Sequence, residues 1–600
     1  MVDPRRIGLR LLLLGGVLLC RIEGASGGSG DFESRRLRLL DVVSREADRS
    51  LFPAAARLAV KKETATAFRI LDSLARDQTI GGMFYAYSMI GTYLHFRAVL
   101  PDSLHRAIRH AFRRRTMYRG DTENHWVMYY TGMYLAAQTW PGEDGTQWFN
   151  GRSSEENFRE ANAWLNHWMR ITTTIGQGEF DSPTYSTIFL APMTVLYEFA
   201  GDTLMKRKAQ MMLDLLFADF AAEHLKGSYG GGHSRDYPDD IVNPLSAPAT
   251  MWAWLYFGFP QFEVWSDSLY RPRNRTSWES LFGVLSSYRL PEIIRAIATD
   301  RAVPYVHRET KRVRNVIRSG EELNPPVFKY TYMTKDFVLG SLQGGILQPI
   351  QQHTWDVTFV SDRPNNTVFT LHPYYAGSEL AMFFPEEQKF MVSEVDRYHL
   401  IYTNPDKWNS SSPFEKTFQH KNTIIVLYDI APGAKHSHID GFFPKTLDRR
   451  IVHPSGWVFC KGGSTYIALF PLKGGDWIDE AIDWRFRSHA LRNGIVVEVF
   501  SADEFSSFEE FMRKMGRRTV DTTGFSRTLS LAYTTLRGDS LQFRYDGGSI
   551  LNGKAVGFAS YRLFSGPFIN ADVGSGVITL MHGGRKRVLD FPSVRITENE

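Results

Sequence analysis

The spacing of apolar residues changes once along this chain, and that change limits the folds open to it. Up to about residue 300, apolar residues recur every three or four positions, as in amphipathic helices, over 52–74, 83–99, 158–171, 192–199 and 205–220. From about residue 325, β-branched and aromatic runs of strand length appear at 327–332, 355–360, 423–428 and 494–500. Because 600 residues are too many for one core, the pattern predicts a helical domain followed by a β domain.

Numerous helices with short breaks between them predict a particular helical architecture. We expect an (α/α) toroid, which is an incomplete barrel of helical hairpins, over residues 32–310. The strands and their turn clusters predict an antiparallel β-sandwich over residues 325–600, with a short helix at 505–514. Residues 300–325, which carry several Lys and Arg side chains, are the expected linker. The predicted fold class is therefore α+β with two domains.

The first residues have the pattern of an export signal. Arg5, Arg6 and Arg10 precede the apolar run 11–20, and small residues follow at 24–26, which predicts a cleavable signal peptide over residues 1–25. Ten apolar residues are too few to span a bilayer, and no later segment has the composition of a membrane span. We therefore expect an exported protein, periplasmic or extracellular, without a membrane span.

The net charge that remains after removal of the signal peptide limits the class of molecule that the protein can bind. Four arginines and two acidic residues would leave with the signal peptide, so the net charge falls from +5 to about +3. A mildly basic chain suits an acidic partner, but it lacks the dense basic stripe of a nucleic-acid-binding protein. Only Cys460 would remain, which excludes an internal disulfide. The sequence leaves the oligomeric state open.

The first chemical motif is Asn124-His125, within the segment 121–130. Asp121 and Thr122 are good N-cap residues, so Asn124 and His125 are expected in the first turn of a helix. The positive end of that helix would stabilise an anion such as a substrate carboxylate, and the neighbouring Trp126 is a candidate sugar contact. The alternative is that Asn124 caps the helix and His125 is a hydrogen-bonded core residue.

The second motif is the loop 176–185, which contains two glycines, two acids, a Ser-Pro turn and a tyrosine. Glycines let a backbone approach a ligand closely, and Pro183 fixes where the next helix begins. Tyr185 is therefore expected at a helix entrance facing the bore of the toroid, with Glu179 polarising a neighbour. The alternative is a Tyr185 that is packed between helices.

The third motif is the loop 230–237, in which three glycines precede His233, Arg235 and Tyr237. Arg235 is the best candidate for a two-pronged clamp on a carboxylate, because its planar guanidinium matches the two carboxylate oxygens. His233 and Tyr237 are candidate substrate contacts beside it. The alternative is a flexible loop with solvated side chains.

The β domain contains candidate metal ligands, although their sequence pattern is less specific than that of the three loops. His353, Asp356 and His372 fall within a few strand lengths of one another, and His436 and His438 alternate along one strand. Either set could hold a structural zinc or calcium ion, or the first could reach over the mouth of the toroid. No metal or cofactor is assigned to the chemistry.

Taken together, these side chains suit the removal of a proton next to a carboxylate. Asn124, His125 and Arg235 can hold the carboxylate and spread the charge that develops on it, and Tyr185 or His125 can move the proton. A tyrosine that acts as the base needs its pKa brought below the ordinary value of about 10, and a nearby cation could do this. This chemistry is β-elimination on a uronic-acid polysaccharide. The signature motifs of metalloproteases, esterases, NTPases and dinucleotide-binding enzymes are absent from the sequence.

A helical toroid before a β-sandwich, with Asn124-His125 and then Tyr185 about sixty residues later, resembles the heparinase II/III-like and alginate-lyase-like polysaccharide lyases. The resemblance implies that Asn124 and His125 neutralise the uronate and that Tyr185 is the acid, or both acid and base. It also implies a His or Tyr from the sandwich, for which His353 and Tyr398 are the candidates. The implied substrate is alginate, glucuronan, an ulvan-like polymer or a glycosaminoglycan.

Two other functions stay open at this point. A toroidal glycoside hydrolase would use two carboxylates, and the sequence offers Glu179, Asp181, Asp236 and Asp239. A non-catalytic glycan-binding protein would hold sugar in the toroid without cleaving it.

Overall fold

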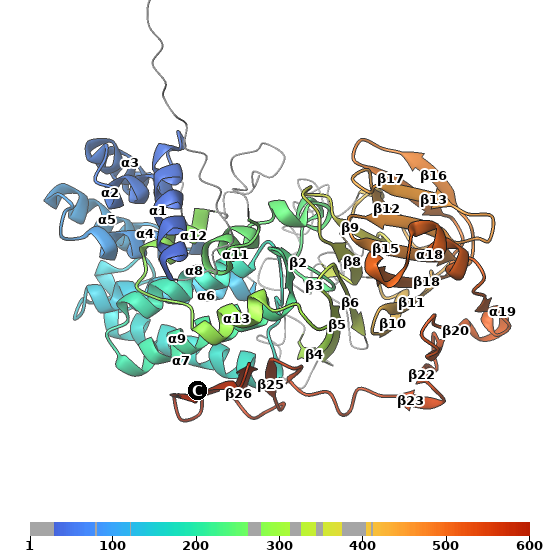
Figure 1. Ribbon diagram of the computed structural model, residues 1–600. Helices are drawn as coiled ribbons and strands as arrows, with labels where there is room; N and C mark the ends of the chain where they lie inside the picture. The colour runs from blue at the N-terminus through green and yellow to red at the C-terminus, as the bar shows by residue number, and fades with distance from the viewer. Residues whose placement is uncertain are drawn as a thin grey trace, which may run out of the picture.

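The computed structural model describes residues 29–77, 81–120, 122–261, 278–312, 326–343, 352–374, 404–409 and 412–599. Helices make up the first half of the chain, and antiparallel sheets make up the second half (Figure 1). The predicted fold class is therefore confirmed. The predicted signal peptide and Tyr398 lie outside the described residues, and no described helix is long and apolar enough to cross a membrane.

The helical domain is built from helices that pack on the next helix of the chain or on the next but one. Its helices are α1 (Ser29–Arg45), α2 (Leu51–Ala59), α3 (Thr64–Arg76), α4 (Met83–Phe96), α5 (Asp102–Arg114), α6 (Glu123–Thr139), α7 (Ser154–Ile175), α8 (Ser186–Phe199), α9 (Thr203–Glu223), α10 (Pro238–Val242), α11 (Ala249–Phe257), α12 (Ser280–Leu285) and α13 (Glu292–Thr299). The first helix, α1, packs against α11 and α12, so the two ends of the series meet as a toroid requires.

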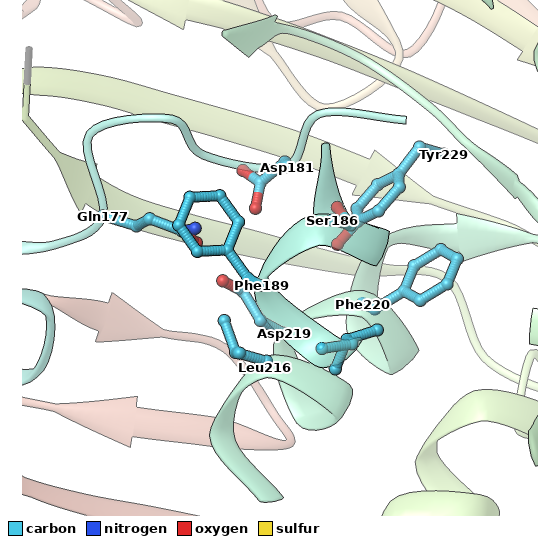
Figure 2. Close-up of a pocket in the computed structure, with 9 residues that line it drawn as sticks. Gln177, Asp181, Ser186, Phe189, Leu216, Asp219, Phe220 and Tyr229 are labelled. Carbon is cyan, nitrogen blue, oxygen red and sulfur yellow. The ribbon is translucent and has the colours of Figure 1, made fainter. Parts of the chain in front are cut away.

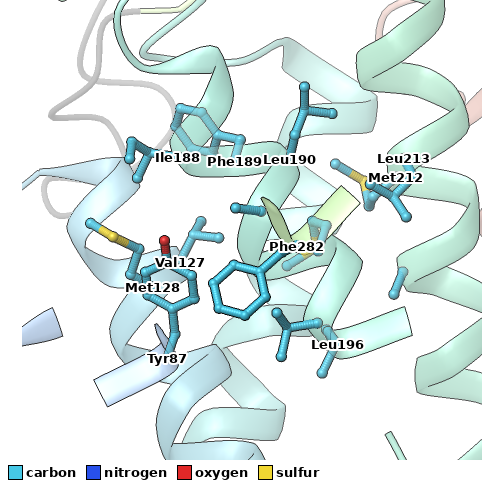
Figure 3. Close-up of a cluster of buried hydrophobic side chains, with 14 of the residues drawn as sticks. Tyr87, Val127, Met128, Ile188, Phe189, Leu190, Leu196, Met212, Leu213 and Phe282 are labelled. Carbon is cyan, nitrogen blue, oxygen red and sulfur yellow. The ribbon is translucent and has the colours of Figure 1, made fainter. Parts of the chain in front are cut away.

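The inner helices are apolar on nearly every side because they form the centre of this domain. Tyr87 of α4, Val127 of α6, Phe189 of α8 and Phe282 of α12 meet in one buried cluster (Figure 3). At Gly132 of α6, an added Cβ would lie 2.8 Å from the backbone of α4, so the two helices touch backbone to backbone there. The outer helix α5 instead buries only one face.

One predicted helix is divided in two. The segment 52–74 has helical spacing throughout, but α2 ends at Ala59 and α3 begins at Thr64. Lys61 and Glu63 have φ angles of 57° and 49°, a left-handed turn that ends one helix and starts the next. Apolar spacing does not reveal such a turn, because the residues that make it are polar and exposed.

Three antiparallel sheets make up the β domain, and the larger two form a sandwich. The first has thirteen strands in the order β16-β17-β12-β9-β8-β6-β5-β4-β24-β25-β26-β27-β28, the second six in the order β10-β11-β18-β15-β14-β13, and the third five, β19 to β23. Trp355 and Val357 of the first sheet meet Val426 and Val497 of the second in a shared core. The other face of the second sheet is covered by α18 and the third sheet. The β-sandwich prediction is confirmed.

The strand bounds match the four apolar runs closely. The strands are β1 (His224–Leu225), β2 (Ser228–Tyr229), β3 (His233–Ser234), β4 (Tyr305–Lys311), β5 (Val327–Met333), β6 (Phe337–Gln343), β7 (Gln352–His353), β8 (Trp355–Phe359), β9 (Thr367–Leu371), β10 (Glu415–His420), β11 (Thr423–Asp429), β12 (Ile439–Pro444), β13 (Arg449–Val452), β14 (Val458–Gly462), β15 (Thr465–Pro471), β16 (Asp476–Asp479), β17 (Asp483–Ser488), β18 (Arg492–Ser501), β19 (Val520–Asp521), β20 (Ser530–Thr534), β21 (Ser540–Arg544), β22 (Gly548–Leu551), β23 (Lys554–Val556), β24 (Phe564–Ser565), β25 (Ile569–Ala571), β26 (Val577–His582), β27 (Arg585–Asp590) and β28 (Arg595–Asn599), and the predicted helix at 505–514 is α18 (Phe508–Met515).

The largest sheet joins the two domains. Strand β4 lies within the stretch 300–325 that the sequence suggested as a linker. Its buried face carries His307, Glu309 and Lys311, which read as polar linker residues in the sequence but are paired with one another in the structure. At the other end of the sheet, β24–β28 pack against α9 and α13 (Figure 1). The C-terminal strands therefore complete part of the hydrophobic core of the helical domain.

Candidate functional site

The predicted loops meet at the start of α6. Thr122 is the N-cap of α6, and Asn124 lies fully buried in its first turn, as expected. The backbone N–H of Asn124 donates to Glu179 Oε2 at 2.9 Å, and the Asn124 side-chain amide donates to the same oxygen. We expected a substrate anion at this positive helix end, but the anion that the structure has there is the Glu179 side chain.

A second acid, Glu123 of α6, also joins the start of this helix to the loop 176–185. Glu123 Oε2 accepts the backbone N–H groups of Gly178 at 2.9 Å and Glu179 at 2.7 Å. Glu123 Oε1 accepts the Trp168 indole N–H at 2.8 Å and an N–H of the Arg312 guanidinium. Burial raises the pKa of Glu123, and the Arg312 charge opposes that shift. These contacts fix Asn124 relative to Glu179, and the role of Arg312 in them was not predicted from the sequence.

Arg235 connects Glu179 to the tyrosines. Its Nε lies 3.2 Å from Glu179 Oε1, and its guanidinium carbon lies 4.5 Å from the centre of the Tyr185 ring. The backbone of Arg235 is left-handed, with φ at 63°, and its carbonyl accepts the Ser182 hydroxyl at 2.9 Å. The side chain is buried. The alternative of a flexible loop with a solvated arginine is therefore excluded.

Two phenols form a pair beside this guanidinium. The hydroxyl oxygens of Tyr185 and Tyr237 are 3.0 Å apart, and Tyr185 precedes α8 as its N-cap residue. Tyr185 is 7% exposed, whereas Tyr237 is half-buried. Burial raises the pKa of Tyr185 well above its ordinary value and outweighs the opposing charge of Arg235. The neighbouring cation therefore does lower this pKa, but burial has the larger effect, so the phenol is protonated at neutral pH and suits an acid better than a base.

The side chains of His125 and its neighbour Trp126 contact different parts of the helical domain. His125 is half-buried and lies edge-on to Phe84, with ring centres 6.0 Å apart. Trp126 is buried, donates its indole N–H to the carbonyl of Gly120 at 2.7 Å and packs edge-on against Trp164. These contacts hold the start of α6 and do not support the predicted sugar contact by Trp126.

The β-sandwich reaches the third loop through a short strand pair. β3 pairs with β7, so that His233 lies opposite His353, and their rings stack 5.8 Å apart. His353 Nε2 lies 3.2 Å from Asp356 Oδ2, and the other oxygen of Asp356 accepts the N–H of Gly231 at 2.9 Å. Burial lowers the pKa of His233 well below its ordinary value. The two histidines thus lie at the junction between the domains.

Two side chains at the predicted metal sets already have partners within the protein. The ring nitrogens of His372 bond the Ser412 hydroxyl at 2.8 Å and the His436 carbonyl at 2.7 Å, which leaves neither for a metal. Asp440, beside His438, accepts hydrogen bonds from two arginines, Arg485 and Arg487. A structural metal at the remaining side chains stays a prediction.

The acids that a hydrolase would need are largely committed elsewhere. Asp181 lies 3.1 Å from the Lys311 ammonium and 2.7 Å from that of Lys329. Burial alone would raise the pKa of Asp181, but the two lysines outweigh it and hold the pKa at about 2. Asp239 is exposed at the start of α10. Asp236 is fully buried, and burial raises its pKa well above the ordinary range, with the Asp240 charge adding to the shift.

A small cavity next to Asp181 is too small for a sugar. Gln177, Asp181, Ser186, Asp219 and Tyr229 line it together with apolar side chains (Figure 2). Its volume is about 10 Å³, which is room for a single water molecule. The cavity belongs to the buried ion pairs between the domains and not to a substrate site.

Comparisons with known proteins add a weak structural likeness. No family model and no curated protein matches the chain. Among solved structures, it is similar to the chondroitin AC lyase of Streptomyces coelicolor in complex with chondroitin sulphate, at 10% identity and a TM-score of 0.27, over 94% of this chain and 77% of that chain. The Y253A mutant of that lyase gives 11% identity and a TM-score of 0.24 over the same shares. Because these TM-scores are low, the function has to be argued from the site itself.

Proposed function

We propose that this protein is a polysaccharide lyase that cleaves a uronic-acid polymer by β-elimination. The observation that supports this most is the unbroken series of contacts from Asn124 through Glu179 and Arg235 to Tyr185. An amide, a guanidinium and a phenol are thereby held at one helix start, next to the imidazole of His125.

The first requirement of the reaction is to stabilise charge on the substrate carboxylate. Arg235 supplies donors for it, and Glu179 holds Arg235 and Asn124 in fixed positions. Asn124 is fully buried, so its part is to fix Glu179 and, through it, Arg235. Donors fixed in advance where charge develops are usually the largest single contribution to such catalysis.

The proton steps follow from the protonation state of the tyrosine. His125 removes the proton from the carbon next to the carboxylate, the C–H electron pair forms the double bond, and the bond to the leaving sugar oxygen breaks. Tyr185 gives its proton to that oxygen, a role that suits a phenol whose pKa is raised by burial. Tyr237, 3.0 Å away and half-buried, can return a proton from solvent to Tyr185.

The competing hydrolase has less support. It requires two carboxyl groups facing one glycosidic bond. Asp181 is neutralised by two lysines, and Glu179 is bound to the start of α6 and to Arg235. We further propose, from the arginine-led apolar run at residues 1–25, that the lyase acts outside the cytoplasm.

The test is to incubate the protein with alginate, glucuronan, ulvan and chondroitin sulphate and to follow the ultraviolet absorbance of the unsaturated uronate. A lyase produces this absorbance with at least one polymer, and the variant Tyr185→Phe should lose it. Saturated products would identify a hydrolase, and tight binding without any cleavage would identify a glycan-binding protein. Either outcome overturns the proposal.

A further inference from the structure

A row of basic residues follows the outer face of α5, and we propose that it is a second binding surface for the acidic polymer. Arg106, His110 and Arg114 are exposed and stand four residues apart, so they lie on one face of the helix about 6 Å from one another along its axis. Figure 1 shows α5 on the outside of the helical domain, at the edge away from the β-sandwich.

These residues differ from the other arginines around α5. Arg109 binds Glu143 and the carbonyl of Gln147, and Arg115 donates to the carbonyls at the end of α3. In the described part of the chain, the side chains of Arg106 and Arg114 have no ion pair or hydrogen bond with another residue.

Among the described residues, the two arginines of the row have no acidic partner. Arg106 and Arg114 lie two turns apart on the same helix face, and Asp102, the acid at the start of the row, forms no ion pair with Arg106. The rest of the protein carries nearly balanced charge, so the row is a local feature and not part of a generally basic surface. A ligand with negative groups would pair with these arginines.

A groove runs beside this row, between α5 and α3. It has a volume of about 510 Å³ and is lined by Ala75, Arg76, Ser103, Arg106, Ala107 and His110. The alanines are short side chains, Arg76 of the lining is paired with Asp72, and Arg106 is the lining cation that forms no ion pair among the described residues. Its size falls within the range of sites that hold a small sugar segment.

The position of the row suggests a polymer as the ligand. The helix α5 ends at Arg114 and leads directly to Tyr118, which is 49% exposed, and then to Asn124 and His125 at the start of α6. Single exposed ion pairs are weak, so a row of them binds well only to a ligand with repeated charges. A uronic-acid polysaccharide has one such charge on each acidic sugar. This inference rests on the proposed function, because that function supplies the polymer.

The test compares long and short substrates with two matched variants. Arg106→Gln/Arg114→Gln removes two charges from the row. The control Arg527→Gln/Arg544→Gln removes two exposed charges of the β domain, one from the short helix Phe525–Thr528 and one from the end of β21. For the α5 variant we expect the half-saturating concentration of long polymer to rise about fivefold, with weaker dependence on salt. The short oligosaccharide of the same polymer should give unchanged kinetics, as should both substrates with the control variant. Equal effects of the two variants, or of the two substrate lengths, would overturn the inference.

A binding measurement separates this inference from the proposed function. Wild type and the α5 variant are applied to columns of immobilised alginate and of chondroitin sulphate, and the salt needed for elution is compared. If wild type cleaves no polymer, the proposed function fails, yet earlier elution of the α5 variant still supports the polyanion surface. Identical elution overturns the inference. So does binding of the row to vesicles of anionic phospholipid without binding to either polysaccharide.

Discussion

At the scale of single residues, the phenol of Tyr185 is the group on which turnover should depend most. Removing its hydroxyl in Tyr185→Phe removes the proposed acid, and turnover should fall at least about 100-fold. Folding should change little, because the aromatic ring remains packed. Steady-state kinetics and thermal unfolding measure the two effects. Tyr134→Phe is the matched control, because Tyr134 is buried and its hydroxyl has no hydrogen-bond partner among the described residues.

The guanidinium of Arg235 should resist replacement by another cation. A lysine ammonium cannot approach Glu179 and lie flat over Tyr185 at the same time, so Arg235→Lys should lower kcat/KM by roughly 100-fold. Lysine keeps the charge and is no more strained than arginine at a φ of 63°, so the change isolates the guanidinium. Wild-type kinetics in this variant would remove Arg235 from the mechanism.

The role of Glu179 separates elimination from hydrolysis. In a lyase it holds Asn124 and Arg235 and does not attack sugar, so Glu179→Gln should weaken activity while the products stay unsaturated. In a hydrolase the same change would remove an essential acid and abolish cleavage. Mass spectrometry distinguishes the unsaturated products of elimination from the saturated products of hydrolysis, which are heavier by one water molecule.

The sequence indicated Asn124, Tyr185 and Arg235 because each stands in a short loop whose glycines, proline or cap residues mark it. It did not indicate Arg312 or Lys329, because their partners Glu123 and Asp181 lie far away along the chain. The pKa of Tyr185 was misjudged for a related reason. A nearby cation can be guessed from sequence, but the degree of burial that outweighs it cannot.

At the scale of elements, Glu123 is the link between α6 and the loop before α8. Its carboxylate accepts two backbone N–H groups, an indole and a guanidinium, all buried. Removing that charge leaves Arg312 without its partner, so Glu123→Gln should lower the free energy of unfolding by about 3–5 kcal/mol. Urea denaturation measures this loss. Glu155→Gln, an exposed change in the first turn of α7, should leave stability within about 0.5 kcal/mol of wild type.

Elements with a clear apolar period were predictable, and those shaped by distant partners were not. The strands β5, β8, β11 and β18 begin and end within two residues of the runs that indicated them. The strand β4 is not evident from the sequence because its buried side chains are polar, and they are paired with one another and with Asp219 of α9. The sequence also offered Asp181 as a candidate carboxylate of a hydrolase, whereas its two lysine partners make it part of the junction between the domains.

At the scale of the whole molecule, buried acids and histidines set the pH of greatest stability. Burial raises the folded pKa of a group of acids, so unfolding releases their protons and stability falls as pH rises above about 4.5. The values are about 7 for Glu223, Asp240, Asp483 and Glu498 and about 8 for Glu415. Burial also lowers the pKa of His95 and His372 to about 4, so unfolding takes up protons and stability falls as pH drops below 6.5. Because these five acids outnumber the two histidines, the melting temperature should be highest at about pH 4.5 and should fall as the pH rises towards 8.

A series of thermal unfolding experiments from pH 4 to 9 tests this expectation. The variant Glu415→Gln removes one of the acids with a raised pKa, so its stability should fall less steeply than that of wild type between pH 5 and 8. A wild-type stability that climbs steadily over that interval would contradict the assignment.

The order of the domains was visible in the sequence, but the sharing of one sheet between them was not. The strands β24–β28 read as further strands of the sandwich, yet Ile578 and Leu580 of β26 belong to the core of the helical domain. Nothing local distinguishes a strand that packs on another sheet from one that packs on helices.

The return of these strands has a consequence for how the chain is made. A ribosome delivers α9 and α13 first, and their partners β25 and β26 emerge only after the entire sandwich has been synthesised. Until then the apolar surface of α9 and α13 that these strands cover is exposed, although the rest of the helical domain has been synthesised and can begin to fold. A nascent chain therefore exposes an apolar, aggregation-prone surface during this interval. Chaperones that bind such surfaces should be needed late in translation and not early.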